Sequence, residues 1–318
     1  MSEVYAQARE GSVYYLVQSA GCLQISGADR IDFLHRQSTN DLRNLVAGQV
    51  RTTVLTSPTA RILDVLHVYP VDEHLQIIPL PGRAAQTAAY LKDKIFFNDK
   101  VELVDVSAEY THIDVLGPAS QQALGEVGFE ALPEVGSQRQ GEIAGVRGDV
   151  LKLEALAAPS AYRLVVPSER VSEVIAQLDA AGMMALDAET AETLRVEAGI
   201  PGPENELTDE YTPLEAGLAA AISDNKGCYT GQEIIARQIT YDKITRSLVR
   251  LRFTESVEVG AKVFGEGKQV GAVTSMAQSP DQGALALAII KRPYNTTGRE
   301  VQIAGDGKEV QANVEEIA

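Results

Sequence analysis

The segment that decides the fold reads Lys226-Gly227-Cys228-Tyr229-Thr230-Gly231-Gln232-Glu233. Thr230 and Glu233 have the spacing of a capping box, which predicts a helix that begins at Thr230 and continues through Gln238. Cys228 would then precede a helix amino terminus, where the helix dipole and the nearby Lys226 lower the pKa of a thiol. Gly227 and Gly231 leave the backbone open to a ligand. These residues fit a reactive thiolate and a small buried hydrophobic side chain equally well, because most free cysteines are buried.

The segments around this motif differ in charge. Residues 187–224 contain ten acidic side chains and one basic side chain, Arg195, whereas residues 226–252 contain six basic and two acidic side chains. A basic segment beside a helix amino terminus can hold a small anion. Ordinary ion pairs on a solvated face explain the same pattern, and charge alone favours that explanation.

Three styles of sequence follow one another along the chain. Residues up to about 185 mix strand and helix patterns, such as the alternating strand expected from Arg61 to Val71. Residues 187–239 are helical, with Asp187 as the predicted cap of one helix and a capping box at Thr212 for another. From about Ser247, short strands separated by glycine and proline indicate a small closed β domain.

Composition restricts the class of protein. The chain has 318 residues, a formal net charge of −16 and an apolar share of 45%. Its length suits about two domains with a sizeable core, and its charge argues against broad binding to nucleic acid or to an anionic membrane surface. Two cysteines and four scattered histidines disfavour a disulfide framework or a zinc site, and Cys22 is expected in the core. With no basic leader and no run near ~20 apolar residues, a cytoplasmic protein is expected.

Several motifs resemble one protein family. The 226–233 segment, followed by Arg237, resembles the motif of YgfZ-type folate-binding proteins at every position. These proteins are relatives of the glycine-cleavage T-protein (aminomethyltransferase) family. Four further segments resemble T-protein motifs: Leu194 to Gly199, Thr212 to Leu218, Phe33-Leu34 with Thr39 to Leu42, and residues 58–66. The resemblance covers nearly the whole chain and is strongest from Leu194 to Leu248.

The resemblance implies a fold and a cofactor. The fold would be an α+β cloverleaf of two intertwined α+β units around a central folate channel, over residues 1–245. A carboxy-terminal β-barrel domain would occupy residues 246–318. The cofactor would be tetrahydrofolate or a derivative.

The resemblance also implies site residues. Glu197 matches a glutamate that hydrogen-bonds the pterin ring, whose aminopyrimidine edge suits a carboxylate acceptor. The alternative is a water-facing acid, although a helix carboxy terminus disfavours an acidic side chain. The other expected folate contacts are Asn40, Lys226, Tyr229, Gln232, Arg237 and Arg246. The two arginines could meet the glutamate tail of the folate, and Asn40 could equally be an ordinary turn residue.

One departure from the T-protein pattern bears on catalysis. The T-protein strand ends in paired aspartates, one of which assists methylene transfer, whereas this chain has Asp64-Val65. Asp64 and Cys228 are therefore the two candidate catalytic residues, and Cys228 is not part of the T-protein pattern.

Three functions follow from the resemblance. The first is a folate-dependent accessory protein for the assembly or repair of iron–sulfur enzymes and, indirectly, for tRNA modification. Its partners would be those enzymes or their assembly machinery, with no direct contact to nucleic acid or membrane. A single thiolate cannot hold a cluster, which usually needs four ligands, so Cys228 would act transiently or in redox chemistry. The second function is an aminomethyltransferase or another one-carbon transferase, and the third is a folate-binding scaffold without chemistry.

Overall fold

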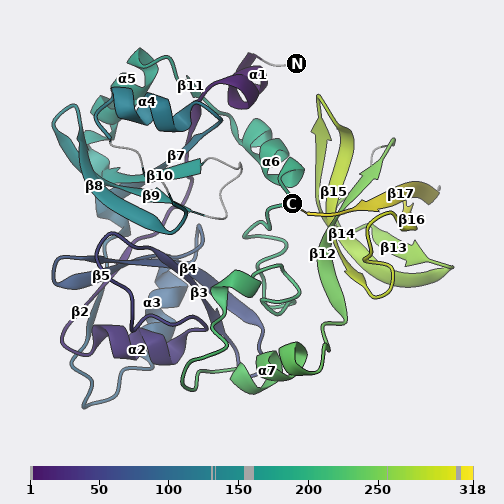
Figure 1. Cartoon of the computed structure of the whole chain (residues 1–318), viewed down its shortest axis with the longest axis horizontal. Helices are drawn as coiled ribbons and strands as arrows, with labels where there is room; N and C mark the ends of the chain where they lie inside the picture. The colour runs from purple at the N-terminus through teal and green to yellow at the C-terminus, as the bar shows by residue number, and fades with distance from the viewer. Residues whose placement is uncertain are drawn as a thin grey trace.

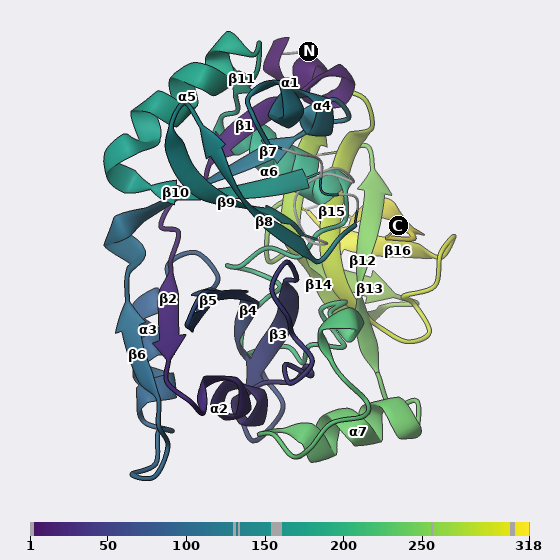
Figure 2. The same cartoon turned by 60° about the vertical axis from the view of Figure 1, so that its left-hand side comes forward.

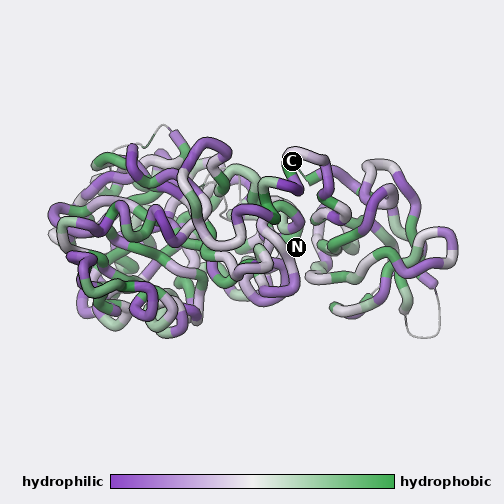
Figure 3. The backbone as a smooth tube through the Cα atoms, turned by 90° about the horizontal axis from the view of Figure 1, so that it is seen from below, coloured by the Kyte–Doolittle hydropathy of each residue, from purple (hydrophilic) through white to green (hydrophobic). Residues whose placement is uncertain are grey.

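The structure, a computed structural model, describes residues 3–129, 132, 134–153, 161–255, 257–305 and 309–317. The chain forms two interleaved α+β units and a closed carboxy-terminal barrel (Figure 1). Seen from below, the barrel is a lobe beside the two units (Figure 3). The predicted fold class is confirmed. Within the described ranges, no helix is long and apolar enough to cross a membrane.

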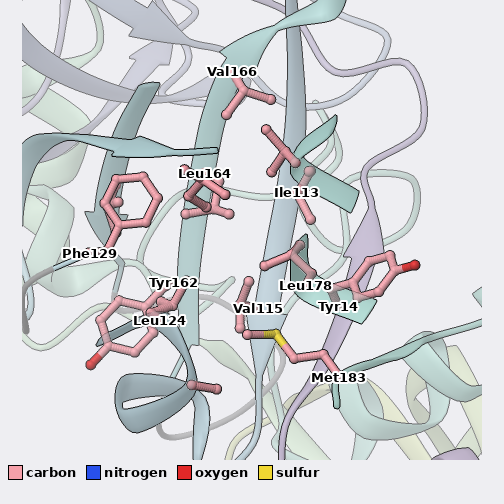
Figure 4. Close-up of a cluster of buried hydrophobic side chains, with 14 of the residues drawn as sticks. Tyr14, Ile113, Val115, Leu124, Phe129, Tyr162, Leu164, Val166, Leu178 and Met183 are labelled. Atoms are coloured by element: carbon pink, nitrogen blue, oxygen red, sulfur yellow. The ribbon is translucent and has the colours of Figure 1, made fainter. Parts of the chain in front are cut away.

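The first unit is built on a six-stranded sheet in the order β11-β1-β7-β10-β9-β8. β1 and β11 pair in parallel, and the other neighbours pair antiparallel. Helices α4 and α5 cover one face, where apolar side chains such as Tyr14, Ile113 and Leu164 form a core (Figure 4). The elements of this unit are α1 (Glu3–Glu10), β1 (Val13–Leu16), β7 (Tyr110–Leu116), α4 (Ser120–Glu126), β8 (Ser137–Ile143), β9 (Val146–Lys152), β10 (Ala161–Pro167), a 3-10 turn (Ser168–Arg170), α5 (Val171–Ala180) and β11 (Met184–Ala185).

The second unit is built on a five-stranded antiparallel sheet in the order β3-β4-β5-β2-β6. Its helices pack on one face, where Phe33 and Leu91 meet Leu66 and Val68. In sequence the unit lies between β1 and β7, so the chain leaves the first sheet and later returns to it. The elements are β2 (Leu23–Ser26), α2 (Arg30–Gln37), β3 (Arg51–Thr56), β4 (Ile62–Val71), β5 (His74–Ile78), α3 (Ala84–Lys92), β6 (Glu102–Asp105) and a 3-10 turn (Ser107–Glu109).

The barrel closes through six strands in the order β12-β15-β14-β13-β16-β17. Alternate residues point inward, as in β17, where Val310, Ala312 and Val314 are buried and their neighbours are exposed. The strands are β12 (Arg246–Phe253), β13 (Lys262–Gly265), β14 (Lys268–Ser279), β15 (Gly283–Lys291), β16 (Glu300–Ala304) and β17 (Glu309–Glu315).

The segment of residues 187–239, predicted to be helical, is mostly irregular between its helices and connects the units to the barrel. It contains α6 (Ala188–Glu197), η3 (Ala219–Ala221) and α7 (Gln232–Thr240). Helix α6 lies between the units and the barrel, where Val196 packs against Leu285 and Leu287 of β15 (Figure 1). This segment therefore holds the three parts of the molecule together.

Most predicted elements are present. The strand expected at Arg61 to Val71 is β4, and Asp187 caps α6 by accepting a hydrogen bond from the Thr190 N–H at 2.8 Å. The capping box at Thr212 forms, with the Thr212 N–H donating to Glu215 Oε2 at 2.9 Å. It supports one turn and no longer helix, because Gly217 follows in the left-handed conformation, with φ +82°.

Candidate functional site

A cavity of about 340 Å³ lies where the two α+β units meet. There β3 approaches the start of β8, and the Val50 N–H donates to the Gly136 carbonyl at 2.7 Å (Figure 2). The volume falls within the range of about 300–1,000 Å³ that is typical of small-molecule sites. The wall mixes amide, hydroxyl, guanidinium, carboxylate and apolar groups, which suits a polar organic ligand. The lining residues are Asn40, Gln49, Val50, Arg51, Thr52, Glu134, Val135, Gly136, Ser137, Leu153 and Ala220.

One side of the cavity is formed by two segments that are hydrogen-bonded to each other. The Asn40 side chain donates to the Thr52 carbonyl at 2.8 Å and to the Ala220 carbonyl at 3.3 Å. The Thr39 hydroxyl donates to the Ala221 carbonyl at 2.7 Å. We call residues 38–41 and 220–226 the Asn40 wall. A ligand in the cavity therefore meets both segments of this wall at once.

Lys226 ends the Asn40 wall and ties it to α2. Its ammonium group donates to the carbonyls of His35, Ser38 and Asn40 at 2.6, 2.5 and 2.8 Å. The last carbonyls of a helix lack partners within the helix, so these donors satisfy the end of α2. Burial lowers the pKa of Lys226 to about 8. The structure thus gives the Lys226 nitrogen three protein partners, whereas the sequence predicted a folate contact.

The rest of the motif is anchored on the turn between β3 and β4. The Thr56 hydroxyl donates to the Thr230 carbonyl at 2.6 Å, and a Cβ atom on Gly231 would lie 2.7 Å from the Ser57 carbonyl oxygen. Gly231, with φ +84°, is the N-cap of α7 and makes no side-chain cap. The predicted capping box at Thr230 is therefore wrong, because the close contact with Ser57 requires a left-handed glycine there.

The two cysteines lie in opposite environments. Cys228 is exposed, while the adjacent Tyr229 is buried against Ala60 and Leu214, and burial raises the pKa of Tyr229 to about 12. Cys22 is fully buried, and burial raises the pKa of its thiol to about 12. The prediction that Cys22 belongs to the core is confirmed. The Cys228 thiol points outward from a backbone that is fixed on both sides.

Glu197 is the last residue of α6 and is 4% exposed. The Tyr5 hydroxyl donates to its Oε1 at 2.6 Å, and the Arg9 guanidinium lies 3.7 Å from Oε2. Among the described residues, buried Oε2 has no hydrogen-bond partner. The water-facing alternative is therefore wrong. A buried carboxylate oxygen without a donor is costly, so this atom is a candidate acceptor for a ligand N–H.

Asp64 and Val65 lie on opposite faces of β4. Asp64 faces the helices, where its Oδ1 accepts from the N–H groups of Val65 and Leu80 at 2.8 and 3.1 Å, and Thr87 of α3 donates to Oδ2. Burial raises the pKa of Asp64 to about 6. Val65 packs on the other face, against Leu207 of the connecting segment. The Asp64 carboxyl group thus holds α3 through Thr87. Val65, which faces the connecting segment, is apolar.

The remaining predicted folate contacts lie outside the cavity wall. Arg246 donates to Glu215 Oε1 at 2.7 Å and stacks over the ring of Tyr211 at 4.9 Å. Arg237 is exposed and pairs with Glu233 at 2.5 Å. Gln232 is the first residue of α7. Of the seven predicted contacts, Asn40 lines the cavity, and Glu197 and the other five do not.

Comparison with known proteins identifies the family. The model of the GCVT N-terminal domain matches residues 2–226, and that of the glycine cleavage T-protein C-terminal barrel domain matches residues 246–316. The chain belongs to the glycine cleavage T-protein family. A chloroplast protein of Arabidopsis thaliana, named provisionally as a transferase, is 33% identical over 93% of this chain and 68% of its own length.

Two aminomethyltransferases are also similar over nearly the whole chain, at lower identity. An aminomethyltransferase of Exiguobacterium sibiricum is 28% identical over 96% of this chain and 86% of its own length. The crystal structure of the glycine cleavage system aminomethyltransferase T from Bartonella henselae shares the fold, with a TM-score of 0.88. That match covers 99% of this chain and 88% of the other chain at 19% identity.

A buried polar cluster on the inner face of the first sheet was not predicted from the sequence. Arg163 of β10 makes a bidentate pair with Asp114 of β7, at 2.7 and 2.8 Å. His67 Nδ1 lies 3.0 Å from the hydroxyl of Thr52, which lines the cavity. Both nitrogens of buried His112 lack a hydrogen-bond partner among the described residues. Burial lowers the pKa of His67 and of His112 to about 3.

The sequence did contain a sign of this cluster. His112 and Asp114 interrupt the strand YTHIDVL, and Arg163 interrupts AYRLVV. Charged side chains in otherwise apolar strands must be paired when they are buried. The prediction that the histidines are scattered rests on their spacing in the sequence. That spacing does not show that two strands from different sheets face each other.

Proposed function

We propose that this T-protein-family chain binds a tetrahydrofolate. We further propose that it acts in the cytoplasm as an accessory protein for the assembly or repair of iron–sulfur enzymes, like the YgfZ-type proteins that its 226–233 motif resembles. The observation that carries the folate proposal is the buried Oε2 of Glu197, which lacks a donor among the described residues. The N–H groups of a pterin edge would supply that donor.

Two places in the chain offer groups to such a ligand: Glu197, and the cavity, which Glu197 does not line. Glu197 would hold the pterin edge, with Tyr5 keeping Oε1 occupied at 2.6 Å so that Oε2 accepts from the ligand. In the cavity, the Arg51 guanidinium would pair with a carboxylate of the glutamate tail. The Asn40 amide nitrogen donates to the Thr52 and Ala220 carbonyls and so shapes the wall. When bound, a tetrahydrofolate supplies nitrogen atoms that can carry one-carbon groups.

A folate-dependent one-carbon transferase is the second candidate, because relatives of this chain are named aminomethyltransferases. The side chain of Val65 argues against it. Val65 occupies the position of the second acid of the T-protein pair and lies in an apolar cluster with Leu207. A missing general acid or base typically lowers a rate by about 10²–10⁴-fold.

The accessory role is supported by the exposed thiol of Cys228. Within the described residues, no group of three His, Cys, Asp or Glu side chains could hold a metal ion. A thiolate suits iron and sulfur chemistry, so Cys228 would contact a client's cluster transiently.

Calorimetry with reduced folates tests the folate proposal. We expect a dissociation constant of about 1 μM or tighter, which corresponds to about −8 kcal/mol. Glu197→Ala should weaken binding by roughly 1–3 kcal/mol, because it leaves the pterin donors unpaired. Glu189→Ala, at an exposed acid of the same helix, is the matched control and should bind as the parent does. Equal affinity of the two variants would remove Glu197 from the site.

Two assays separate the accessory role from the transferase. With an aminomethyl-lipoyl carrier, methylene transfer to tetrahydrofolate should be absent or very slow, and rapid turnover would favour the transferase. In cells that lack the protein, the parent chain should restore the activity of iron–sulfur enzymes and Cys228→Ser should not. Full restoration by Cys228→Ser would favour a folate-binding scaffold.

A further inference from the structure

We infer that Lys226 is a positioning residue that couples occupancy of the cavity to the reactivity of the Cys228 thiol. The inference rests on the proposed function for the identity of the ligand, a reduced folate. The link itself is formed by described residues of the chain and can be tested with and without that ligand.

The link begins in the cavity. Asn40 and Ala220 both line it, and the Asn40 amide donates to the Ala220 carbonyl at 3.3 Å. The Ser223 N–H then donates to the Thr39 carbonyl at 3.1 Å, three residues before Lys226. A ligand that moves either segment of the Asn40 wall therefore moves both of them.

Lys226 carries this movement to the motif. An ammonium group has three N–H donors, and here the three acceptors are the carbonyls of His35, Ser38 and Asn40. The Asn40 carbonyl belongs to the residue whose side chain lines the cavity. With its donors directed at these carbonyls, Lys226 acts on Cys228 by fixing the backbone two residues away.

The far side of Cys228 is anchored by contacts of its own, and the Lys226 ammonium group also lies 5.1 Å from the centroid of the Tyr229 ring. Thr56 holds the Thr230 carbonyl at 2.6 Å, Gly231 lies against Ser57, and Tyr229 is buried. Gly227 and Cys228 are the exposed residues between the two anchors, and a Cβ atom on Gly227 would meet nothing within 4 Å. A displacement at Lys226 would therefore reach Cys228 from both sides, through the backbone of Gly227 and through the Tyr229 ring, and would change how the thiol is presented.

Alkylation of Cys228 by iodoacetamide, followed by mass spectrometry, measures this coupling. In the parent protein, saturating reduced folate should change the alkylation rate by at least about five-fold, the lower end of typical couplings between sites. In Lys226→Met, at a folate concentration that calorimetry shows to be saturating for that variant, the alkylation rate should no longer respond to folate. Lys226→Arg, which keeps cationic donors, should recover part of the response. Buried Cys22 should stay unlabelled in every folded variant.

Variants of Asn40 test the link without any ligand. Asn40→Ala removes the hydrogen bond to the Ala220 carbonyl. It should change the alkylation rate of Cys228 when it is introduced into the parent protein, and it should have no effect on that rate when it is introduced into Lys226→Met. A folate effect that persists in Lys226→Met would show simple shielding and overturn the inference. An Asn40→Ala effect that is equal in both backgrounds would also overturn it. If the parent fails to bind folate, the proposed function fails, while the Asn40→Ala comparison still decides the link.

Discussion

At the scale of single residues, the Asp64 carboxyl group illustrates how burial changes the role that a motif suggests. Its two oxygens meet the N–H groups of Val65 and Leu80 and the hydroxyl of Thr87. Burial raises its pKa from 3.8 to about 6, because the charged form loses hydration. The folded state therefore binds a proton that the unfolded state has released, and folding stability falls as the pH rises from about 4 to about 6.

Asp64→Asn should remove this pH dependence. The amide oxygen can accept from Val65 and Leu80, and the amide nitrogen can donate to Thr87. We expect the variant to match or exceed the stability of the parent at pH 7, with the difference shrinking toward pH 4, as measured by urea unfolding. Asp64→Ala should lose roughly 1–3 kcal/mol at every pH, because it leaves buried donors unpaired. A parent whose stability rises relative to Asp64→Asn across this interval would contradict the burial argument.

At the scale of elements, the start of α7 depends on one glycine. Gly231 has φ +84°, and a Cβ atom there would lie 2.7 Å from the Ser57 oxygen, whereas a Cβ atom on Gly227 would meet open space. Gly231→Ala should therefore destabilise the protein by roughly 1–3 kcal/mol, the usual strain of a non-glycine residue in such a conformation. Gly227→Ala is the matched control and should stay within about 0.5 kcal/mol of the parent. Chemical unfolding of both variants measures the difference, and equal stabilities would refute the close-contact explanation.

The same element shows where prediction from sequence succeeds and where it fails. β4 and the cap at Asp187 were predicted because their signals are local: alternation in the strand and a carboxylate three residues before an N–H. The start of α7 was missed because Ser57, which lies far away in sequence, decides it. The role of Lys226 was missed for the same reason, since its acceptors, the carbonyls of His35, Ser38 and Asn40, lie far away in sequence. Asn40 could be predicted as a cavity residue only through a family motif.

At the scale of the whole molecule, the two α+β units enclose neutral histidines at their junction. Burial lowers the pKa of His67 and of His112 from 6.5 to about 3. The positive charge of Arg163 lowers both pKa values further. The unfolded state binds protons below pH 6.5 that the folded state does not bind. The contribution of these two histidines to folding stability is therefore fully present above about pH 6.5 and is lost as the pH falls toward 3.

His112→Leu should make the protein more resistant to acid. The substitution removes an imidazole whose nitrogens lack partners among the described residues, so it should cost little at pH 7. The midpoint of acid unfolding, followed by near-ultraviolet circular dichroism of the tyrosines, should move to lower pH. His74→Leu, at the partly exposed start of β5, is the control and should leave the midpoint unchanged. An unchanged midpoint in His112→Leu would show that other groups govern the acid transition.

The entry and exit of the second unit lie side by side. The Val106 N–H donates to the Cys22 carbonyl at 2.9 Å, and the Cys22 N–H donates to the Ser107 hydroxyl at 3.0 Å. Residues 22–106 thus form a closed loop of chain inserted between β1 and β7, so they can complete their sheet while the ribosome is still translating the rest. β1 leaves the ribosome earlier but has no partner until β7 emerges, and β11 adds to it later still. Of the two α+β sheets, the one that begins first is therefore finished last during synthesis.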